Sequence, residues 1–452
     1  MLNFCRFKRR CYFLFVFLVA IVFIFLPKIS VNFSIFLLII LNILYFISDI
    51  VRSFLFLYKI KEYNYNDYFE KDNLKVSDDE LPIYSILLPV RDEQYFVLKK
   101  LLKSIYNLDY PKNKLDIKFV VDEYDEKTIA VGRKLLKKFN FSLIIVPDYR
   151  IKSKPLSCNY ALRFVKGKYL TIYDAEDRPE KYQLKKVIQK FNELSDDYVC
   201  LQASLNFYNK YRNFLTYCFS IEYSMWFDFT IRTIEEFGSF FPLGGTSNHF
   251  KTDKLLELGK WDGFNVTEDA ELGIRIAKAK YKVSYIKSIT EEECPISIYA
   301  WIKQRTRWIK GFMQTFCEYI FLKKPIFVKS KINFKPIRKL KIFDIITFNL
   351  FIMMSFFFFI SILVIILNLT ILKNIHYFSF LIFMSYFNII YLLLMTYISF
   401  IVISIKNKIK FNTIYFIFFP FYWLLHYIAG IIAFYSLMFN PFYWSKTKHG
   451  NK

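Results

Sequence analysis

The amino-acid sequence predicts an α/β domain with a mostly parallel, doubly wound sheet, framed by α-helical transmembrane segments at both ends of the chain. Short β-rich runs alternate with helical stretches between residues 82 and 318, a pattern typical of parallel sheets with helices on both faces. Long apolar runs precede and follow this block, and several are long enough to cross a bilayer. The 452 residues are 55% hydrophobic and 21% aromatic, more than a soluble protein of this length usually contains.

The first 58 residues are predicted to form a transmembrane hairpin. Apolar runs cover residues 12–26 and 31–58, and four Lys and Arg residues between positions 6 and 10 precede the first run. A signal peptide is the alternative, but no small-residue cleavage site follows the first run and a second span comes at once. With the basic N-terminus inside, two crossings return the chain to the cytoplasm.

The hydrophilic block begins with residues 59–81, which are charged, lack periodicity and suit a linker. Residues 82–318 are predicted to form the α/β domain. Active sites of such domains lie at the carboxyl ends of the strands. The expected strands are residues 83–90, 117–121, 141–146 and 169–173, and the expected helices are residues 93–106, 126–139 and 157–165.

The C-terminal part returns to apolar composition. It divides into a basic interfacial connector at 319–341, transmembrane or interfacial helices at 342–440 and a basic tail at 441–452. Apolar runs at 345–369 and 378–405 are long enough to span. The run at 414–439 contains Pro420, and a full crossing would place the basic tail outside, against the positive-inside trend. Spanning, re-entrant and interfacial placements of this run therefore all stay open.

Charge and cysteine usage exclude several classes. The formal net charge is +24, but the basic residues are scattered or lie beside apolar runs, which fits a membrane surface better than nucleic acid. The seven cysteines are widely spread without a C-x-x-C pair, which argues against a disulfide scaffold or a zinc site. We therefore expect the hydrophilic block to face the reducing cytoplasm.

Acidic groups follow three of the predicted strands in an otherwise basic chain. Carboxylates that converge at one sheet edge repel each other and need a divalent cation, or the hydrogen-bond donors of a ligand, for compensation. A nucleotide sugar with Mg²⁺ or Mn²⁺ supplies both. For Asp92 and Glu93, helix capping is an equally good interpretation. The three groups are Asp92-Glu93, Asp122-Glu123 and Asp174-Ala175-Glu176-Asp177.

Two loops further along carry small or acidic residues. Residues 241–249 include Gly244 and Gly245, which would let the backbone approach a substrate closely, although paired glycines more often mark only a turn. Residues 261–269 end in Thr267-Glu268-Asp269, where Thr267 could simply cap a helix.

A helix predicted at 297–316 places Gln304, Arg307 and Trp308 on one face. That face offers an amide, a guanidinium for phosphate and an indole for a sugar ring. The alternative is an amphipathic helix that lies on the membrane surface.

Taken in order, these motifs resemble those of the membrane-bound family 2 glycosyltransferases, which include cellulose, hyaluronan and chitin synthases. The resemblance covers residues 83–313. Its motifs are Pro89-Val90-Arg91-Asp92-Glu93, the K-x-x-x-x-N-x-A-L stretch at 154–162, D-A-E-D at 174–177, T-E-D at 267–269 and Q-x-x-R-W at 304–308.

The resemblance implies a Rossmann-like GT-A fold, a nucleoside diphosphate sugar donor, a divalent metal (Mg²⁺ or Mn²⁺) and inversion at the anomeric carbon. Asp269 would be the general base, with Glu268 beside it, and Arg307 would stabilise the leaving diphosphate. Asp174 with Glu176 or Asp177 would bind the metal, and Asp122 or Glu123 would contact the nucleotide base, expected to be uracil. The remaining substrate-binding residues would be Glu93, Lys154, Asn159, Gly244, Gly245 and Thr246 for the donor and Gln304 and Trp308 for the acceptor.

Two departures bear on this resemblance. Asp122-Glu123-Tyr124-Asp125 stands where many members have paired aspartates, and the C-terminal membrane part is short. The expected activity is elongation of a polysaccharide or glycosylation of a lipid at the inner face of a bacterial inner membrane. A single-addition glycolipid transferase and, from another class, a transporter with a non-catalytic soluble domain are the alternatives. The expected partners are the donor, a carbohydrate or lipid acceptor and membrane lipids, with no nucleic acid; a secretion partner is left open.

Overall fold

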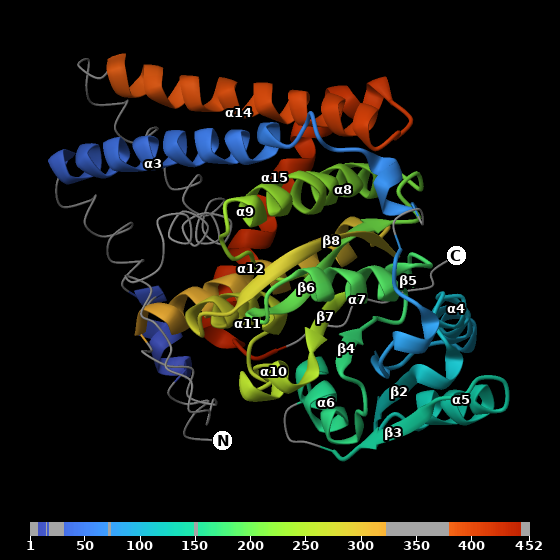
Figure 1. Ribbon diagram of the computed structural model, residues 1–452. Coiled ribbons are helices and arrows are strands. Elements are labelled where there is room, and N and C mark those ends of the chain that lie inside the picture. Colours follow the sequence, from blue (N-terminus) through green and yellow to red (C-terminus); the bar gives the residue numbers. More distant parts are fainter. Residues whose placement is uncertain are drawn as a thin grey trace.

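The computed structural model describes residues 8–14, 16–17, 31–70, 74–148, 152–321 and 379–443. Within them, one sheet lies between two layers of helices, and long apolar helices lie beyond one of these layers (Figure 1). Several predictions fall outside the described residues: the apolar residues 18–26, most of the connector (322–341), the run at 345–369 and the end of the tail (444–452).

The sheet contains eight strands in the order β3-β2-β1-β4-β7-β6-β8-β5. β1, β2, β3, β4, β6 and β8 all run in one direction, while the four-residue β7 and the two-residue β5 run against them. The carboxyl ends of the long strands therefore lie along one edge, where the antiparallel β7 begins. The strands are β1 (Tyr84–Val90), β2 (Leu115–Asp122), β3 (Ser142–Val146), β4 (Tyr169–Ile172), β5 (Arg178–Pro179), β6 (Tyr198–Phe207), β7 (Asn248–Lys251) and β8 (Lys282–Glu292).

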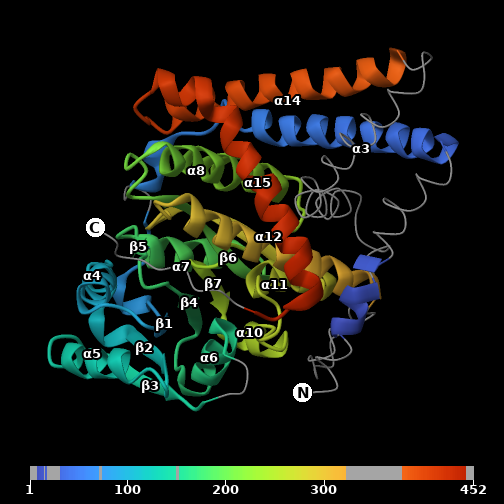
Figure 2. The same cartoon turned by 180° about the vertical axis from the view of Figure 1, so that it is seen from behind.

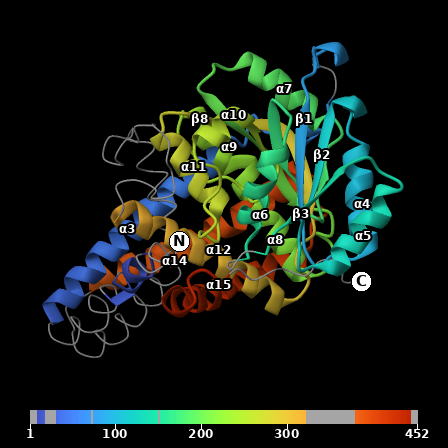
Figure 3. The ribbon, with the colours of Figure 1, turned by 90° about the horizontal axis from the view of Figure 1, so that it is seen from below.

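Helices cover both faces because successive strand residues point to opposite sides. Ile86 and Leu88 of β1 join one buried cluster with α4 (Tyr95–Tyr106), α5 (Glu126–Leu136) and α7 (Gln183–Glu193). Leu87 joins a second cluster on the other face. That cluster includes residues of α6 (Lys154–Ala161), α8 (Phe214–Ser224), the π-helix η6 (Met225–Thr230), α9 (Ile231–Glu236), α10 (Thr252–Glu257) and α11 (Glu268–Lys278). Figure 3 shows β1, β2 and β3 from below, with α4 and α5 on their outer side.

Three described helices are long and apolar enough to cross a membrane: α3 (Val31–Tyr58), α14 (Ser379–Lys406) and α15 (Thr413–Phe439). α3 and α14 lie side by side in both Figure 1 and Figure 2. Asn42 of α3 accepts hydrogen bonds from Ser385 and Asn388 of α14, the kind of polar contact that joins helices in lipid. The run of unclear placement at 414–439 forms a single helix that continues through Pro420.

The last helix of the α/β domain, α12 (Ile298–Phe321), is covered by both ends of the described chain. α15 crosses α12 (Figure 2), and residues 8–14 and 16–17 are helical. A buried cluster joins the three segments through Tyr12, Val16, Ile309, Met313, Cys317, Ala429, Ala433 and Leu437. The linker expected at 59–81 is also packed: Tyr68 is fully buried, and its hydroxyl donates to Asp228 of η6.

Candidate active site

The acidic groups predicted at strand ends do lie along one edge of the sheet. β1, β2 and β4 are parallel neighbours, and they end at Val90, Asp122 and Ile172. Asp92 follows β1 with a φ of 50°, a left-handed conformation that Asp tolerates better than most residues. Its backbone N–H donates to Asp125 at the N-terminus of α5. This turn is therefore fixed by α5, which Asp125 caps. The capping alternative for Asp92 and Glu93 concerned α4, whose N-cap residue is Gln94, so neither acidic residue occupies the N-cap position.

The D-A-E-D motif forms hydrogen bonds within itself and with the glycine loop. The Asp174 backbone N–H donates to Asp177 Oδ2 at 2.7 Å, and the Thr246 hydroxyl donates to the same carboxylate. Asp177 is 1% exposed, and none of the described residues hydrogen-bonds to its Oδ1. Burial raises the pKa of Asp177, and the charges of Asp174 and Glu176 raise it further. Burial, Asp174 and Glu93 likewise raise the pKa of Glu176, so Glu93 also belongs to this group.

Lys154 connects three of the predicted motifs. It is the first residue of α6, and its Nζ lies 2.6 Å from Asp174 Oδ1 and donates to the Gly245 carbonyl at 2.8 Å. Burial lowers the pKa of Lys154, but the carboxylates of Asp174, Asp269 and Glu268 outweigh this and leave the pKa raised. The ammonium is thus a fixed positive charge between the metal motif, the glycine loop and the T-E-D motif.

The T-E-D motif opens α11. Thr267 occupies the N-cap position without a side-chain capping bond, so capping does not account for this residue. Asp269 is 5% exposed, and within the described part of the chain its Oδ1 has no hydrogen bond of normal geometry. Burial raises the pKa of Asp269, and the adjacent Glu268 raises it further, although the Trp261 indole acts to lower the pKa of this carboxyl. A Cβ added to Gly245 would lie 4.0 Å from Asp269 Oδ2 and meet no other atom within 4 Å, so open space lies in front of this carboxylate.

α12 brings the Q-x-x-R-W face against the same loop. Arg307 Nη1 donates to the Val266 carbonyl at 3.3 Å. Burial lowers the pKa of Arg307, while Glu268 and Asp174 act in the opposite direction, and a guanidinium stays charged in proteins. The approach requires Gly311, because a Cβ there would lie 2.3 Å from Thr267 Oγ1. Gln304 Oε1 is buried and has no hydrogen-bond partner in the ranges that the structure describes, and the Trp308 ring stacks on Tyr223 with 6.1 Å between centroids.

The sequence profile of the family described as "Glycosyltransferase like family 2" matches residues 82–311. The chain belongs to this glycosyltransferase family.

Relatives of this family 2 glycosyltransferase include one from Bacillus subtilis (strain 168) named "Probable glycosyltransferase YdaM", which is 28% identical over 289 residues, or 62% of this chain and 63% of the relative. A "Beta-monoglucosyldiacylglycerol synthase" from Nostoc sp. is 24% identical over 244 residues, or 53% of this chain and 51% of that protein. The chain thus spans about half to two thirds of the length of these relatives.

A solved structure confirms the GT-A fold. The mannosyltransferase PcManGT from Pyrobaculum calidifontis, in complex with GDP-Man and Mn²⁺, superposes with a TM-score of 0.56 at 14% identity and covers 89% of this chain and 99% of its own. The alignment extends well beyond the region that the family profile matches.

Other predicted site residues of the glycosyltransferase form hydrogen bonds with neighbouring side chains or backbone groups. Asp122 accepts hydrogen bonds from Ser157 and from Tyr124, each at 2.7 Å, and Glu123 accepts one from the backbone of Asp148 at 3.2 Å. Asn159 donates to the Trp261 carbonyl at 2.8 Å and accepts from its N–H at 3.1 Å. The Asn159 amide thus braces the loop before the T-E-D motif, and its expected contact with the donor stays a prediction.

Two residues of the site were missed in the sequence. Glu292, at the end of β8, has a pKa raised by burial and by Asp177, Glu176 and Asp174, so it adds a carboxylate to the acidic edge. Gln202 of β6 holds the glycine loop, accepting from the Gly244 N–H at 2.8 Å and donating to the Thr246 carbonyl at 3.1 Å. Glu292 lies in Glu291-Glu292-Glu293 after a β-rich run, the same signal that identified the other acidic groups.

The acidic residues fit a divalent cation that shares its ligands with a substrate. Across the described part of the chain, no three His, Cys, Asp or Glu side chains are placed to hold a metal ion on their own. Asp177 nevertheless presents a buried oxygen that no described residue hydrogen-bonds, and the negative charges of Asp174, Glu176 and Asp177 repel one another. Mg²⁺ in particular is commonly held by one or two carboxylates together with substrate phosphates and water.

Proposed function

We propose that this glycosyltransferase transfers a sugar, with inversion, from a nucleoside diphosphate sugar to a lipid acceptor at the cytoplasmic face of a bacterial inner membrane. The observation that carries this proposal is the position of Asp269: a buried carboxylate whose Oδ2 faces open space at Gly245. The positive charges of Lys154 and Arg307 both interact with the negative charge of the Asp269 carboxylate.

Asp269 would act as the general base. The acceptor hydroxyl attacks the anomeric carbon, its proton passes to Asp269, and the bond from that carbon to the diphosphate oxygen breaks as the diphosphate leaves. A carboxylate whose pKa is raised by burial and by Glu268 is a stronger base than an exposed aspartate, which suits proton transfer near neutral pH.

Positive charges would stabilise the leaving diphosphate. Lys154 and Arg307 are held in place by the Gly245 and Val266 carbonyls, so they need little reorganisation during the reaction. Asp174, Glu176 and Asp177 would hold Mg²⁺ or Mn²⁺. When bound, such a cation supplies further positive charge to the diphosphate oxygens.

Further predicted residues would bind the nucleotide base of the donor and the acceptor. Asp122 or Glu123, next to the end of β2, would contact the base of a uridine nucleotide. Trp308 and Gln304 on α12 would line the acceptor path. A lipid acceptor is favoured over a growing polymer because a relative is named a monoglucosyldiacylglycerol synthase and because three apolar helices lie next to the domain. Polysaccharide elongation is the second candidate.

A donor screen tests the proposal. The full chain, purified in detergent with diacylglycerol, would be incubated with labelled UDP- and GDP-sugars, with and without Mg²⁺ or Mn²⁺, and nucleoside diphosphate release would be measured. We expect metal-dependent release with a UDP-sugar and one sugar on an extractable lipid. A high-molecular-mass product would favour elongation, and no release with any donor would contradict the activity.

A further inference from the structure

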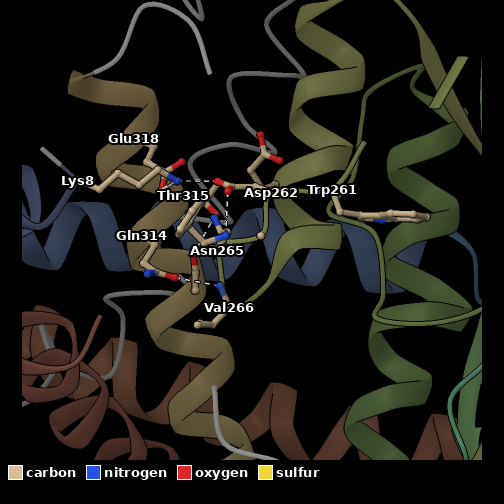
Figure 4. A network of polar contacts seen from close by, with 12 residues as sticks. Lys8, Trp261, Asp262, Asn265, Val266, Gln314, Thr315 and Glu318 are labelled. Atoms are coloured by element: carbon tan, nitrogen blue, oxygen red, sulfur yellow. Dashed lines mark hydrogen bonds and ion pairs between the residues drawn. The ribbon is translucent and has the colours of Figure 1, made fainter. Parts of the chain in front are cut away.

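A buried ion pair connects the start of the chain to the loop before Asp269. Lys8 Nζ lies 2.6 Å from Asp262 Oδ2 and 2.7 Å from Glu318 Oε1 (Figure 4). The Lys8 side chain is only 1% exposed. In the sequence, Lys8 belongs to a basic run that was expected to face the cytoplasmic membrane surface. Its neighbours Arg9 and Arg10 are exposed, so Lys8 alone of the three turns into the protein.

The N-terminal helix is anchored to α12 at this point. The Tyr12 hydroxyl donates to Glu318 Oε1 at 2.6 Å, and Tyr12 and Val16 pack against α12 and α15. A buried ammonium that pairs with two buried carboxylates is costly to break, because removal of one partner leaves charge without compensation. Burial raises the pKa of Glu318 to about 7, and Lys8 opposes that rise.

Asp262 belongs to the base loop, residues 261–267, which leads directly into α11 and Asp269. Its Oδ1 accepts from the Phe264 N–H at 2.9 Å, while Oδ2 faces Lys8. On the other side, Asn265 donates to Thr315 of α12 at 2.8 Å, and the Val266 N–H donates to Gln314 at 3.1 Å (Figure 4). The Lys8 pair thus completes a set of hydrogen bonds that fixes the base loop against α12.

We propose that Lys8 is a positioning residue for sugar transfer: its pair with Asp262 and Glu318 holds the base loop, and with it Asp269, in the reactive position. The N-terminal helix is then part of the catalytic domain as well as a membrane-proximal segment. The catalytic part of this inference rests on the proposed function, whereas the order of the base loop does not.

The test compares Lys8→Met with Arg9→Met, a matched loss of an exposed charge on the same helix, and with Lys8→Arg. Hydrogen–deuterium exchange would be followed in peptides covering residues 262–271. The rate of transfer would be divided by the concentration of nucleotide-binding sites, so that a lower fraction of folded protein does not lower the measured kcat. For Lys8→Met we expect at least tenfold faster exchange in the loop and at least tenfold lower kcat, with the donor KM within twofold of wild type. Arg9→Met should match wild type, and Lys8→Arg should restore most of the loss.

Unchanged exchange in Lys8→Met, or equal effects in Arg9→Met, would overturn the proposal. Faster exchange in Lys8→Met with unchanged kcat per site would also overturn it. Lys8 would then order the base loop, but this order would not affect sugar transfer. If Lys8→Met does not fold, Asp262→Asn removes the ion pair between Lys8 and the base loop while it leaves the Lys8–Glu318 pair, and it should also accelerate exchange in the loop. If the wild-type protein transfers no sugar, the proposed function fails, while the exchange measurement still decides whether Lys8 orders the loop.

Discussion

Glu268 and Asp269 are adjacent carboxylates in the first turn of α11, and both are buried. Burial raises the pKa of Asp269 first, and the negative charge of Glu268 raises it further. Two groups this close titrate as a pair. If Asp269 is the general base, transfer requires its ionised form and is lost as the pH falls through this raised pKa.

Glu268→Gln removes the repulsion and should lower the pKa of Asp269. The acid limb of the pH profile of kcat/KM, which reports the free enzyme, is therefore expected to move to lower pH. Glu257→Gln, which removes a carboxylate paired with Lys254 on α10, serves as the control and should leave the profile unchanged. A shift of the acid limb to higher pH, or none, would contradict the assignment.

Gly245→Ala tests the open space in front of Asp269. The added methyl would lie 4.0 Å from Asp269 Oδ2 and meet nothing closer, so the melting temperature should hold. The kcat/KM for the acceptor should fall by about tenfold, because the methyl would displace the acceptor from Asp269 and a misplacement of reacting groups by 1 Å can cost on the order of a hundredfold in rate. Gly273→Ala, whose methyl would lie 2.6 Å from the Phe241 carbonyl, should instead destabilise the fold. Equal losses of stability in the two variants would refute this account of Gly245.

Individual site residues can be predicted from the sequence where they follow a strand or share one face of a helix. Asp174, Lys154 and Asp269 were expected together, and Lys154 Nζ does lie 2.6 Å from Asp174 Oδ1. Lys8 and Asn159 could not be placed, because their partners Asp262 and Trp261 lie 254 and 102 residues away in the chain. No local pattern specifies such pairs.

At the scale of elements, periodicity identifies the long strands and helices well. The expected strand at 83–90 is β1 (Tyr84–Val90), and the expected helix at 297–316 is α12 (Ile298–Phe321). The antiparallel direction of β7 was not predicted, because a four-residue strand after a glycine loop carries no signal of its partner. Because of Pro420, the sequence left the placement of residues 414–439 open. The helix α15 nevertheless continues through this proline, as helices in apolar surroundings often do.

Gly311 sets how closely α12 approaches the base loop. A glycine in a helix normally gains about 1 kcal/mol when replaced by alanine. Here the added Cβ would lie 2.3 Å from Thr267 Oγ1 and 2.8 Å from Thr267 Cβ, so we expect Gly311→Ala to destabilise by about 1–3 kcal/mol and to lower transfer. Thermal unfolding measures the first effect. Lys303→Ala on the same helix is the control, and a Gly311→Ala variant more stable than wild type would contradict the close approach.

For the whole molecule, the site and the apolar helices form one connected structure. α12 carries the Q-x-x-R-W face and packs against α15, while Arg305 of α12 pairs with Glu222 of α8 at 2.6 Å. Composition predicted both a membrane part and a catalytic part. The docking of the N-terminal helix and α15 onto α12 could not be predicted, because apolar runs reveal that a helix is buried or lipid-facing but not which surface covers it.

The proposed placement at the cytoplasmic face predicts integral attachment with the domain inside. The chain should stay in the membrane fraction after high-salt and carbonate washes, because burial of three apolar helices does not depend on charge. Protease should digest residues 84–292 in inverted vesicles and spare them in intact spheroplasts. Release by salt, or digestion from outside the cell, would contradict the predicted placement.

The most direct test of the central claim is to measure sugar transfer and nucleoside diphosphate binding on the same preparation of Asp269→Asn. Asparagine keeps the shape of the side chain but cannot accept the proton. Transfer should fall by a factor on the order of 10²–10⁴, while nucleotide affinity stays within about twofold, since under the proposed function Lys154 and Arg307, and not Asp269, would hold the diphosphate. Transfer close to that of the wild type would contradict the role of Asp269 as the base, as would equal losses of transfer and binding.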